Sequence, residues 1–582
     1  MMPELAIVHP ALLLLATAVL VAAVPWPAIR RLPLLMAPLT LMLLWLVQPG
    51  HNLVWLGLEL HWLQPSALGR LFASAFVLAL WGTSLYGLTS LRRHELAAAW
   101  GYAAGALIVC FSGDWLCLLC GWELMAVAST LIILSGRQPD SDKAGMRYLL
   151  IHLAGGVLLL SGVATLAASG QSLLFGPLTP ATTAYWLILA GVLVNTGAPP
   201  LGFWVADAYP QASAAGMVIL SALTTKTAVF VLLSAFAGEP LLIAIGLYLC
   251  LYGTLYALLA DDLRRLLAYS IIHQVGFMVV AAGIGSPAAI NGAAAQAFAH
   301  IAYKMTLVMA AGVLLQQLGQ CRASTLPALA RQLPLTSGCV LVAAAASLGL
   351  PLTAGFVSKT LLVGSAAASS WPWLETALLL SSAAVVFNAG IRFPALALFG
   401  AGPTQPQTVP PLTRLNGNVR LALLGSALLC LLPGWWPQLF CRLLPFAEPR
   451  QPYSLPAVLH QLQLVLIAGL VCLLSWPFLR PAAGYSLDWN TLFARLFQLW
   501  QRLLDSQRQL GRYLWQLLTS SQVRSFMFLF RTHGPHGILA RSWPTGSLAL
   551  WVALLLASYI VLYNLKTRSL WQFFCTSFGL GC

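Results

Sequence analysis

Hydrophobic residues gather in long stretches along the chain, and short polar connections separate them. Stretches of about 20 apolar residues, the length that crosses a bilayer, recur along nearly all 582 residues. We expect about 14 to 16 of them by this criterion. A backbone that faces lipid must form its hydrogen bonds within one segment, so each stretch is predicted to be a helix. The pattern therefore predicts an all-α polytopic membrane protein.

The order of the stretches divides the chain into six parts. We expect N-terminal transmembrane helices, two blocks of five helices each, C-terminal transmembrane helices, an amphipathic region, and a final transmembrane helix with a tail. These parts correspond to residues 1–96, 97–238, 239–400, 401–480, 481–545 and 546–582.

The two blocks share a local signature in their fourth stretch. Proline and glycine interrupt the apolar residues in Gly197-Ala-Pro-Pro-Leu-Gly-Phe203 and in Gly349-Leu-Pro-Leu-Thr-Ala-Gly-Phe356. Because five crossings are an odd number, the two blocks insert with opposite orientation. Paired broken helices in inverted repeats indicate a transport site near the middle of the bilayer. The alternative is two unrelated proline kinks.

The region 481–545 has a different character. Leucines recur at helical spacing on one face, while arginine, glutamine and Asp505 occupy the other. The leucines are Leu492, Leu496, Leu499, Leu503, Leu510, Leu514 and Leu517. This pattern predicts an amphipathic helix of about 30 residues that lies along the membrane interface and against other helices. We call it the lateral helix.

The charges fit a membrane protein and not a nucleic-acid-binding protein. Hydrophobic residues make up 59% of the chain and charged residues 8%, with a net charge of +15. The arginines and lysines fall in alternate connections: Arg30, Arg31, Arg92, Arg93, Arg137, Lys143, Arg147, Arg264, Arg265, Arg322 and Arg331. This asymmetry places those connections in the cytoplasm and the N-terminus outside. We therefore expect a multi-pass protein of the bacterial inner membrane.

Cysteines and glycines give no sign of a resident cofactor or metal. The pair Cys117 and Cys120 lies in an apolar helix, where small membrane cysteines are the better interpretation than a metal or redox motif. Cys575 and Cys582 are candidates for a disulfide if the tail is periplasmic. A glycine-rich dinucleotide loop is absent from the sequence, so any redox chemistry is expected in partner proteins.

Ionisable side chains inside apolar stretches are the main candidates for function, because burying a charge in a membrane is costly. Lysine suits a proton relay, since burial disfavours its charged form and a nearby carboxylate favours it. The alternative is an ion pair that only fixes helix packing. The candidate relay residues are Glu123, Lys226, His300, Lys304 and Lys359, with His152 and His273 as weaker candidates.

Six segments, in this order, resemble the antiporter-like membrane subunits of NADH:quinone oxidoreductases, Mrp-type cation/proton antiporters and membrane-bound hydrogenases. Two of them, the Asp-Ala-Tyr-Pro and Thr-Thr-Lys-Thr segments, are most similar to the D-type component of the Mrp antiporters. The segments are Trp122-Glu-Leu-Met125, Phe203-Trp-Val-Ala-Asp-Ala-Tyr-Pro210, Leu223-Thr-Thr-Lys-Thr-Ala228, Asp262-Leu-Arg-Arg-Leu-Leu-Ala-Tyr-Ser270, Ala299-His-Ile-Ala-Tyr-Lys304 and Gly355-Phe-Val-Ser-Lys359.

The resemblance implies two inverted five-helix repeats crossed by a chain of buried charges. It also implies residue roles: Glu123 as the fifth-helix carboxylate, Lys226 as the central lysine, and Lys359 as the exit lysine. His300 and Lys304 correspond to the eleventh-helix relay. The lateral helix is similar to one that some members lay across neighbouring subunits. The resemblance therefore implies other membrane subunits as partners and protons as the cargo, with Na⁺ as a second cation to test.

One departure from the family pattern leaves two hypotheses open. Where the family usually has a lysine, nine residues before Trp204, this chain has Asn195, which carries no charge. The first hypothesis is a subunit that translocates protons, with Na⁺/H⁺ exchange as a variant, in an ion-pumping or antiporter complex. The second is a non-conducting subunit that binds partners. Whether the chain is part of an enzyme depends on the complex to which it belongs.

Overall fold

The chain forms two compact units, residues 1–489 and 490–582. The computed structural model describes residues 8–25, 27–50, 52–55, 58–180, 182–400, 412–447 and 452–479 of the first unit. In the second unit it describes residues 502, 504–516, 523, 525–531 and 550–560. Of the second unit, residues 504–516, 525–531 and 550–560 are helical. The pairing of Cys575 with Cys582 and most of the lateral helix fall outside the described residues.

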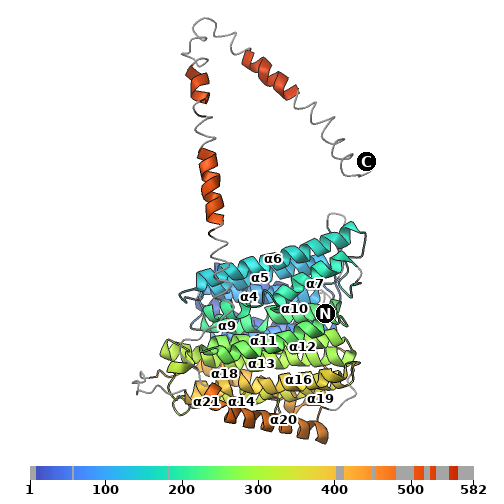
Figure 1. Cartoon of the computed structure of the whole chain (residues 1–582), viewed down its shortest axis with the longest axis vertical. Coiled ribbons are helices and arrows are strands. Elements are labelled where there is room, and N and C mark those ends of the chain that lie inside the picture. Colours follow the sequence, from blue (N-terminus) through green and yellow to red (C-terminus); the bar gives the residue numbers. More distant parts are fainter. Residues whose placement is uncertain are drawn as a thin grey trace. The chain divides into compact units, whose positions relative to one another are not determined.

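The first unit is a bundle of helices that run roughly side by side (Figure 1). Its N-terminal part holds three α-helices, a short 3-10 helix and a two-stranded antiparallel hairpin in which Leu53 pairs with Leu60. The elements are α1 (Pro10–Ala23), η2 (Pro27–Arg31), α2 (Leu32–Leu46), β1 (Leu53–Trp55), β2 (Leu58–Leu60) and α3 (Ala67–Tyr86).

The first block has five spans, and two of them are interrupted. They are α4 (Arg93–Phe111), α5 (Trp115–Leu134), α6 (Ser141–Ala168), α7 (Thr183–Thr196) with α8 (Trp204–Ala208) and η3 (Tyr209–Gln211), and α9 (Ala214–Ala222) with α10 (Thr224–Ala235).

The second block repeats this order. It consists of α11 (Leu241–Leu259), α12 (Leu263–Ile284), α13 (Pro287–Leu318) with η4 (Ala323–Thr325), α14 (Pro334–Leu348) with α15 (Ala354–Ala367), and α16 (Pro372–Ala384) with η5 (Val385–Phe387), α17 (Arg392–Pro394) and η6 (Ala395–Phe399). The first unit ends with α18 (Gly417–Trp435), α19 (Pro437–Cys441), α20 (Leu455–Leu474) and α21 (Trp476–Leu479).

Equivalent caps identify the two blocks as inverted repeats. Asp114 caps the start of α5 through the backbone N–H of Cys117, and Asp262 caps the start of α12 through Arg264 and Arg265. Asp114 lies at the helix ends opposite the arginine-rich connections, whereas Asp262 lies within one of those connections. The same helix therefore begins on opposite sides in the two blocks, as the sequence predicted.

The predicted broken helices are confirmed at both signatures. Gly197 ends α7 with a φ of 83°, and Gly349 ends α14 with a φ of 77°, a left-handed conformation that glycine adopts at little cost. Both glycines donate to carbonyls of the preceding turn: Gly197 to Leu193 and Val194, Gly349 to Ala345 and Ala346. Each repeat thus carries, in its fourth span, a helix that stops inside that span.

Twelve helices of the described residues are long and apolar enough to cross a membrane, and five shorter apolar helices accompany them. The sequence predicted 14 to 16 spans, which is more than the twelve long helices alone and fewer than the long and short helices together.

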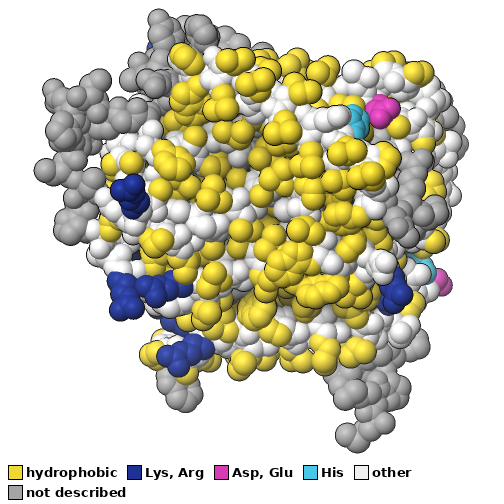
Figure 2. Space-filling view, turned by 90° about the horizontal axis from the view of Figure 1, so that it is seen from below, with side chains coloured by type: hydrophobic (Ala, Val, Ile, Leu, Met, Phe, Trp, Pro, Cys, Tyr) yellow, Lys and Arg dark blue, Asp and Glu magenta, His cyan; other side chains and the backbone are white. Residues whose placement is uncertain are grey.

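Figure 2 shows one face of the molecule on which hydrophobic side chains predominate and the visible lysines and arginines lie near the edges. Such a surface suits lipid. The all-α polytopic fold is confirmed; the part boundaries inside the first unit stay predictions.

Candidate functional site

Lys226 is fully buried beside an interruption between α9 and α10. Its ammonium donates to the carbonyl of Ser221 at 2.6 Å and to Thr225 Oγ1 at 3.1 Å. Ser221 belongs to the last turn of α9, whose carbonyls lack partners within the helix. The negative end of the α9 dipole therefore faces the charge on Lys226.

Lys304 and His300 lie one turn apart in the middle of α13, and both are fully buried. Lys304 donates to Ser270 Oγ on α12. Both ring nitrogens of His300 are buried without a hydrogen-bond partner among the described residues, and its ring contacts Tyr303 edge to face at 5.3 Å. His300 lies within electrostatic reach of Lys226, Lys304 and His273.

A second group of hydrogen-bonded side chains lies beside this pair and joins three helices. Gln296 of α13 donates to Gln274 Oε1 of α12 at 2.7 Å and accepts from Ser358 Oγ of α15 at 2.6 Å. Its amide group also lies 3.3 Å from the hydroxyl of Tyr303. All four side chains are buried, so the polar path extends from α12 and α13 to the helix that carries Lys359.

Lys359 lies on α15, just after the break in the second repeat. Its ammonium donates to the carbonyl of Leu348, the last residue of α14, at 3.2 Å. Gln461 of α20 donates to the same carbonyl at 2.8 Å. Lys226 and Lys359 thus share one arrangement, in which a buried ammonium binds a carbonyl in the last turn of an interrupted helix.

His273 lies on α12, between the two ends of this path. Its Nδ1 lies 2.9 Å from the carbonyl of Cys250 and 2.7 Å from Thr254 Oγ1, while its Nε2 is buried without a partner among the described residues. His273 lies within electrostatic reach of Lys359 and Lys304. The structure therefore brings together five predicted residues: Lys226, His300, Lys304, His273 and Lys359.

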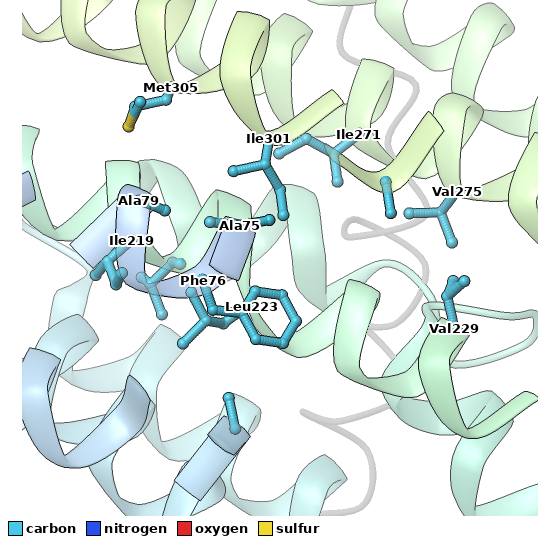
Figure 3. Close-up of a cluster of buried hydrophobic side chains, with 14 of the residues drawn as sticks. Ala75, Phe76, Ala79, Ile219, Leu223, Val229, Ile271, Val275, Ile301 and Met305 are labelled. Atoms are coloured by element: carbon cyan, nitrogen blue, oxygen red, sulfur yellow. The ribbon is translucent and has the colours of Figure 1, made fainter. Parts of the chain in front are cut away.

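Apolar side chains surround the helices of this set. Figure 3 shows a buried cluster to which α3, α9, α10, α12 and α13 all contribute, with Leu223 at the interruption before Lys226. Water-excluding surroundings strengthen the interaction between charges because they lower the local dielectric constant. The relay candidates can therefore influence one another over longer distances than charges on a wet surface.

Glu123 and His152 lie apart from that set. Glu123 on α5 is half-buried and rests against Gly156 of α6, where a Cβ would lie 2.0 Å from Glu123 Oε1. The neighbouring Gly155 faces Asn195, whose Oδ1 is buried without a partner among the described residues. Glu123 and Asn195 thus contact adjacent glycines of α6. His152 stacks on Tyr148, with ring centroids 3.8 Å apart.

An ion pair that the sequence analysis did not anticipate joins α6 to α8. Arg147 donates twice to Asp207, with Nε–Oδ2 and Nη2–Oδ1 both at 2.8 Å. The side chain of Asp207 is 11% exposed and that of Arg147 30% exposed. This two-pronged geometry is the strong form of the interaction, and it holds the segment after the first broken helix.

Replacing Arg147 by glutamine is expected to destabilise the protein by about 2 kcal/mol, because the mostly buried carboxylate of Asp207 loses its counter-charge. The melting temperature of the purified protein should fall. The control is Lys143→Gln, since Lys143 is 76% exposed and its pair with Asp140 spans 3.6 Å. Equal melting temperatures for both variants would show that the Arg147–Asp207 pair adds no stability.

Several polar residues of the path were missed from the sequence. Gln296 continues the face of His300 and Lys304 by one more turn of four residues, so that spacing contained a usable signal. Gln461 carried none, because α20 lies outside both repeats. The described residues contain no group of three or more His, Cys, Asp or Glu side chains able to hold a metal ion.

These features define a class: polytopic helical membrane proteins with two inverted five-helix repeats, a broken helix in each, and buried lysines on the inner helices. The family described as NADH:quinone oxidoreductase/Mrp antiporter matches residues 112–385, a range that includes every relay candidate. NADH-quinone oxidoreductase subunit N of Desulforudis audaxviator is 32% identical over 410 residues, covering 65% of this chain and 80% of that protein. The chain belongs to this family of antiporter-like membrane subunits.

One further relative in sequence and one solved structure show how much of the chain is shared with other proteins. An uncharacterized protein of Mycobacterium tuberculosis is 34% identical over 301 residues, 47% of each chain, so the chain spans about half the length of that relative. A chain in the structure of the Mrp complex from Dietzia sp. DQ12-45-1b superposes with a TM-score of 0.71 at 22% identity. That match covers 95% of this chain and 62% of the other, and it shows the shared fold.

Proposed function

We propose that the chain translocates protons within a multi-subunit membrane complex, through a relay of Lys226, His300, Lys304 and Lys359 with His273 beside it. Glu123 and His152 lie apart from this relay in the first repeat, and we assign them at most a minor part in the flux. The observation that carries the proposal is the burial of three lysines: Lys226 and Lys304 are 0% exposed and Lys359 is 3% exposed.

Their partners favour a relay over a packing role. A lysine that only fixes helix packing needs a carboxylate to offset the cost of burial. The ion pairs found among the described residues are Lys143–Asp140, Arg147–Asp207 and Arg508–Asp505, so none of the three buried lysines has a described carboxylate partner. Each instead binds neutral carbonyl or hydroxyl oxygens, which permit both the charged and the neutral form.

The family context supports the same proposal. The relatives include NADH-quinone oxidoreductase subunits, hydrogenase-4 component B and a probable K⁺/H⁺ antiporter subunit. Other membrane subunits are therefore the proposed partners, the inner membrane of a bacterium the proposed location, and the N-terminus is proposed to lie outside. The alternative is a docking role, in which a non-conducting subunit only binds partners. One observation favours it: the uncharged Asn195 stands where the family usually has a lysine.

The test is proton flux in vesicles that contain the chain with its co-purifying subunits. Collapse of an imposed pH gradient would be followed for wild type, Lys304→Gln and the exposed-lysine control Lys143→Gln, with Na⁺ or K⁺ present or replaced by choline. We expect flux in wild type and the control and at least about a tenfold loss in Lys304→Gln, since a neutral amide cannot carry the proton. Equally small flux in all three intact complexes would favour the docking role.

A further inference from the structure

Four buried hydroxyl groups form a continuous hydrogen-bonded chain in the first repeat, where the family's usual lysine is replaced by Asn195. They are Tyr102 of α4, Thr224 of α10, Tyr148 of α6 and Ser129 of α5. Each is at most 3% exposed. Since four separate helices supply these side chains, the contact between them is a feature of the tertiary fold.

The donors and acceptors of the chain are determined by its ends. Tyr102 OH accepts from the backbone N–H of Thr224 at 2.8 Å, and it donates to Thr224 Oγ1 when Thr224 Oγ1 in turn donates to Tyr148. Tyr148 OH donates to Ser129 Oγ at 3.0 Å, which leaves its oxygen to accept from Thr224 Oγ1 at 3.3 Å. Ser129 Oγ donates to the carbonyl of Met125 at 2.6 Å.

The resulting order is Tyr102, Thr224, Tyr148, Ser129, with every hydroxyl accepting one hydrogen bond and donating the next. Such a chain transfers a proton without acquiring charge. When Tyr102 takes up one proton, each hydroxyl passes its own proton to the next and Ser129 releases one toward the arginine-rich side, so that four neutral hydroxyls remain. Rotation of the four hydroxyls restores the starting order or reverses the direction, because hydroxyl groups both donate and accept.

The chain slopes from the arginine-rich side of the membrane toward Lys226. Ser129 lies about 8 Å from the end of α5 at Leu134, and Thr224 about 15 Å from the start of α9 at Ala214, at 1.5 Å per residue. Arginine binds beside both helix ends: Arg92 donates to the carbonyl of Ser135 after α5, and Arg264 donates to the carbonyl of Ala212 before α9. Thr224, the second member of the chain, is followed in sequence by Thr225, whose Oγ1 accepts from Lys226 at 3.1 Å; this places Lys226 in the turn of α10 that also carries Thr224.

A histidine flanks the chain at its middle. The imidazole of His152 stacks on the ring of Tyr148, and its Nδ1 lies 2.9 Å from the carbonyl of Tyr148. Trp204 contacts the same imidazole edge to face at 4.6 Å. The buried Nε2 of His152 has no partner among the described residues, and the stacking holds this histidine against the hydroxyl chain.

We propose that the hydroxyls of Tyr102, Thr224, Tyr148 and Ser129 carry protons between the arginine-rich side and Lys226, in place of the lysine that Asn195 replaces. This role rests on the proposed function. Asn195 faces Gly155 of α6, and no hydrogen bond joins it to the chain among the described residues. Between the arginine-rich side and Lys226 the first repeat therefore conducts through neutral oxygens, whereas the path from Lys226 onward runs through lysines and histidines.

The decisive variants change one hydroxyl and little else. Thr224→Val keeps the shape of the side chain and removes the hydroxyl, and Thr224→Ser keeps the hydroxyl. We expect Thr224→Val to lower proton flux at least fivefold in the vesicle assay and Thr224→Ser to retain more than half. Tyr148→Phe should resemble Thr224→Val. The control is Thr40→Val, because Thr40 is buried and its hydroxyl donates only to Met36 of its own helix.

The outcomes separate this proposal from the proposed function. Wild-type flux that Lys304→Gln abolishes and Thr224→Val leaves within twofold would overturn the hydroxyl chain and keep the lysine relay. Equal losses in Thr224→Val and Thr224→Ser, with a lowered melting temperature in both, would assign Thr224 a structural role and also overturn it. Absence of flux in wild type would overturn the proposed function itself.

Discussion

Lys226→Gln is expected to lower proton flux at least about tenfold while the complex stays assembled. Glutamine is one bond shorter than lysine but carries an amide N–H, the kind of donor that the carbonyl of Ser221 and Thr225 Oγ1 accept from Lys226, so the site stays polar. What is lost is the group at that position that can gain and lose a proton. Because Lys226 belongs to the first repeat and lies within electrostatic reach of Lys304 in the second, its loss breaks the path at its centre.

The comparison variant for Lys226→Gln is Glu123→Gln in the same vesicles. Glu123 is half-buried and lies outside the electrostatic neighbourhood of the lysines, so we expect a loss of less than about threefold, worth under about 1 kcal/mol of barrier. A full loss in Glu123→Gln together with normal flux in Lys226→Gln would mean that the path runs through the first repeat without the central lysine.

Gly355→Ala is expected to destabilise the second broken helix by about 3 kcal/mol or more. A Cβ at Gly355 would lie 1.7 Å from the carbonyl oxygen of Ala346 and 2.8 Å from its carbonyl carbon. Both are backbone atoms of α14, so no side-chain rotation can relieve the clash. α14 and α15 must then separate, and the yield and melting temperature of the purified protein should both fall.

Gly425→Ala provides the control for this substitution. Gly425 lies within α18, and nothing among the described residues lies within 4 Å of the position that its Cβ would occupy. Alanine favours a helix over glycine by about 1 kcal/mol, so this variant should be as stable as wild type or slightly more stable. Gly355→Ala with the stability of wild type would show that the α14–α15 junction can open without cost.

Much of the fold could be predicted because membrane helices are recognisable by their length and apolar character. The two broken helices were visible as well, since proline and glycine stand inside apolar stretches at Gly197 and Gly349. The interruption at Leu223 was not visible. Residues 214–235 have the pattern of one apolar span, and the break coincides with a tertiary contact, the hydrogen bond from the N–H of Thr224 to Tyr102.

Some residues of the candidate site could likewise be predicted from the sequence, and others could not. Lys226, Lys304 and Lys359 stood out because a charge inside an apolar stretch needs an explanation. Ser129, Tyr148 and Gln461 did not, since serine, tyrosine and glutamine gain meaning only from the partners that the fold supplies. The pairing expected for Glu123 depended on a lysine that this chain lacks, and no sequence rule indicates which oxygens replace it.

The carbonyl of Leu348 accepts from Lys359 and from Gln461 at the same time, and this has a thermodynamic consequence. The end of α14 interacts more strongly with an ammonium than with a neutral amine. By reciprocity, any movement of that helix end changes how tightly Lys359 holds its proton, and each change of protonation pulls on or releases the helix end by the same free energy. Gln461 extends this coupling to α20, which lies outside the repeats. A neighbouring protein that moves α20 would therefore change the fraction of Lys359 that holds its proton.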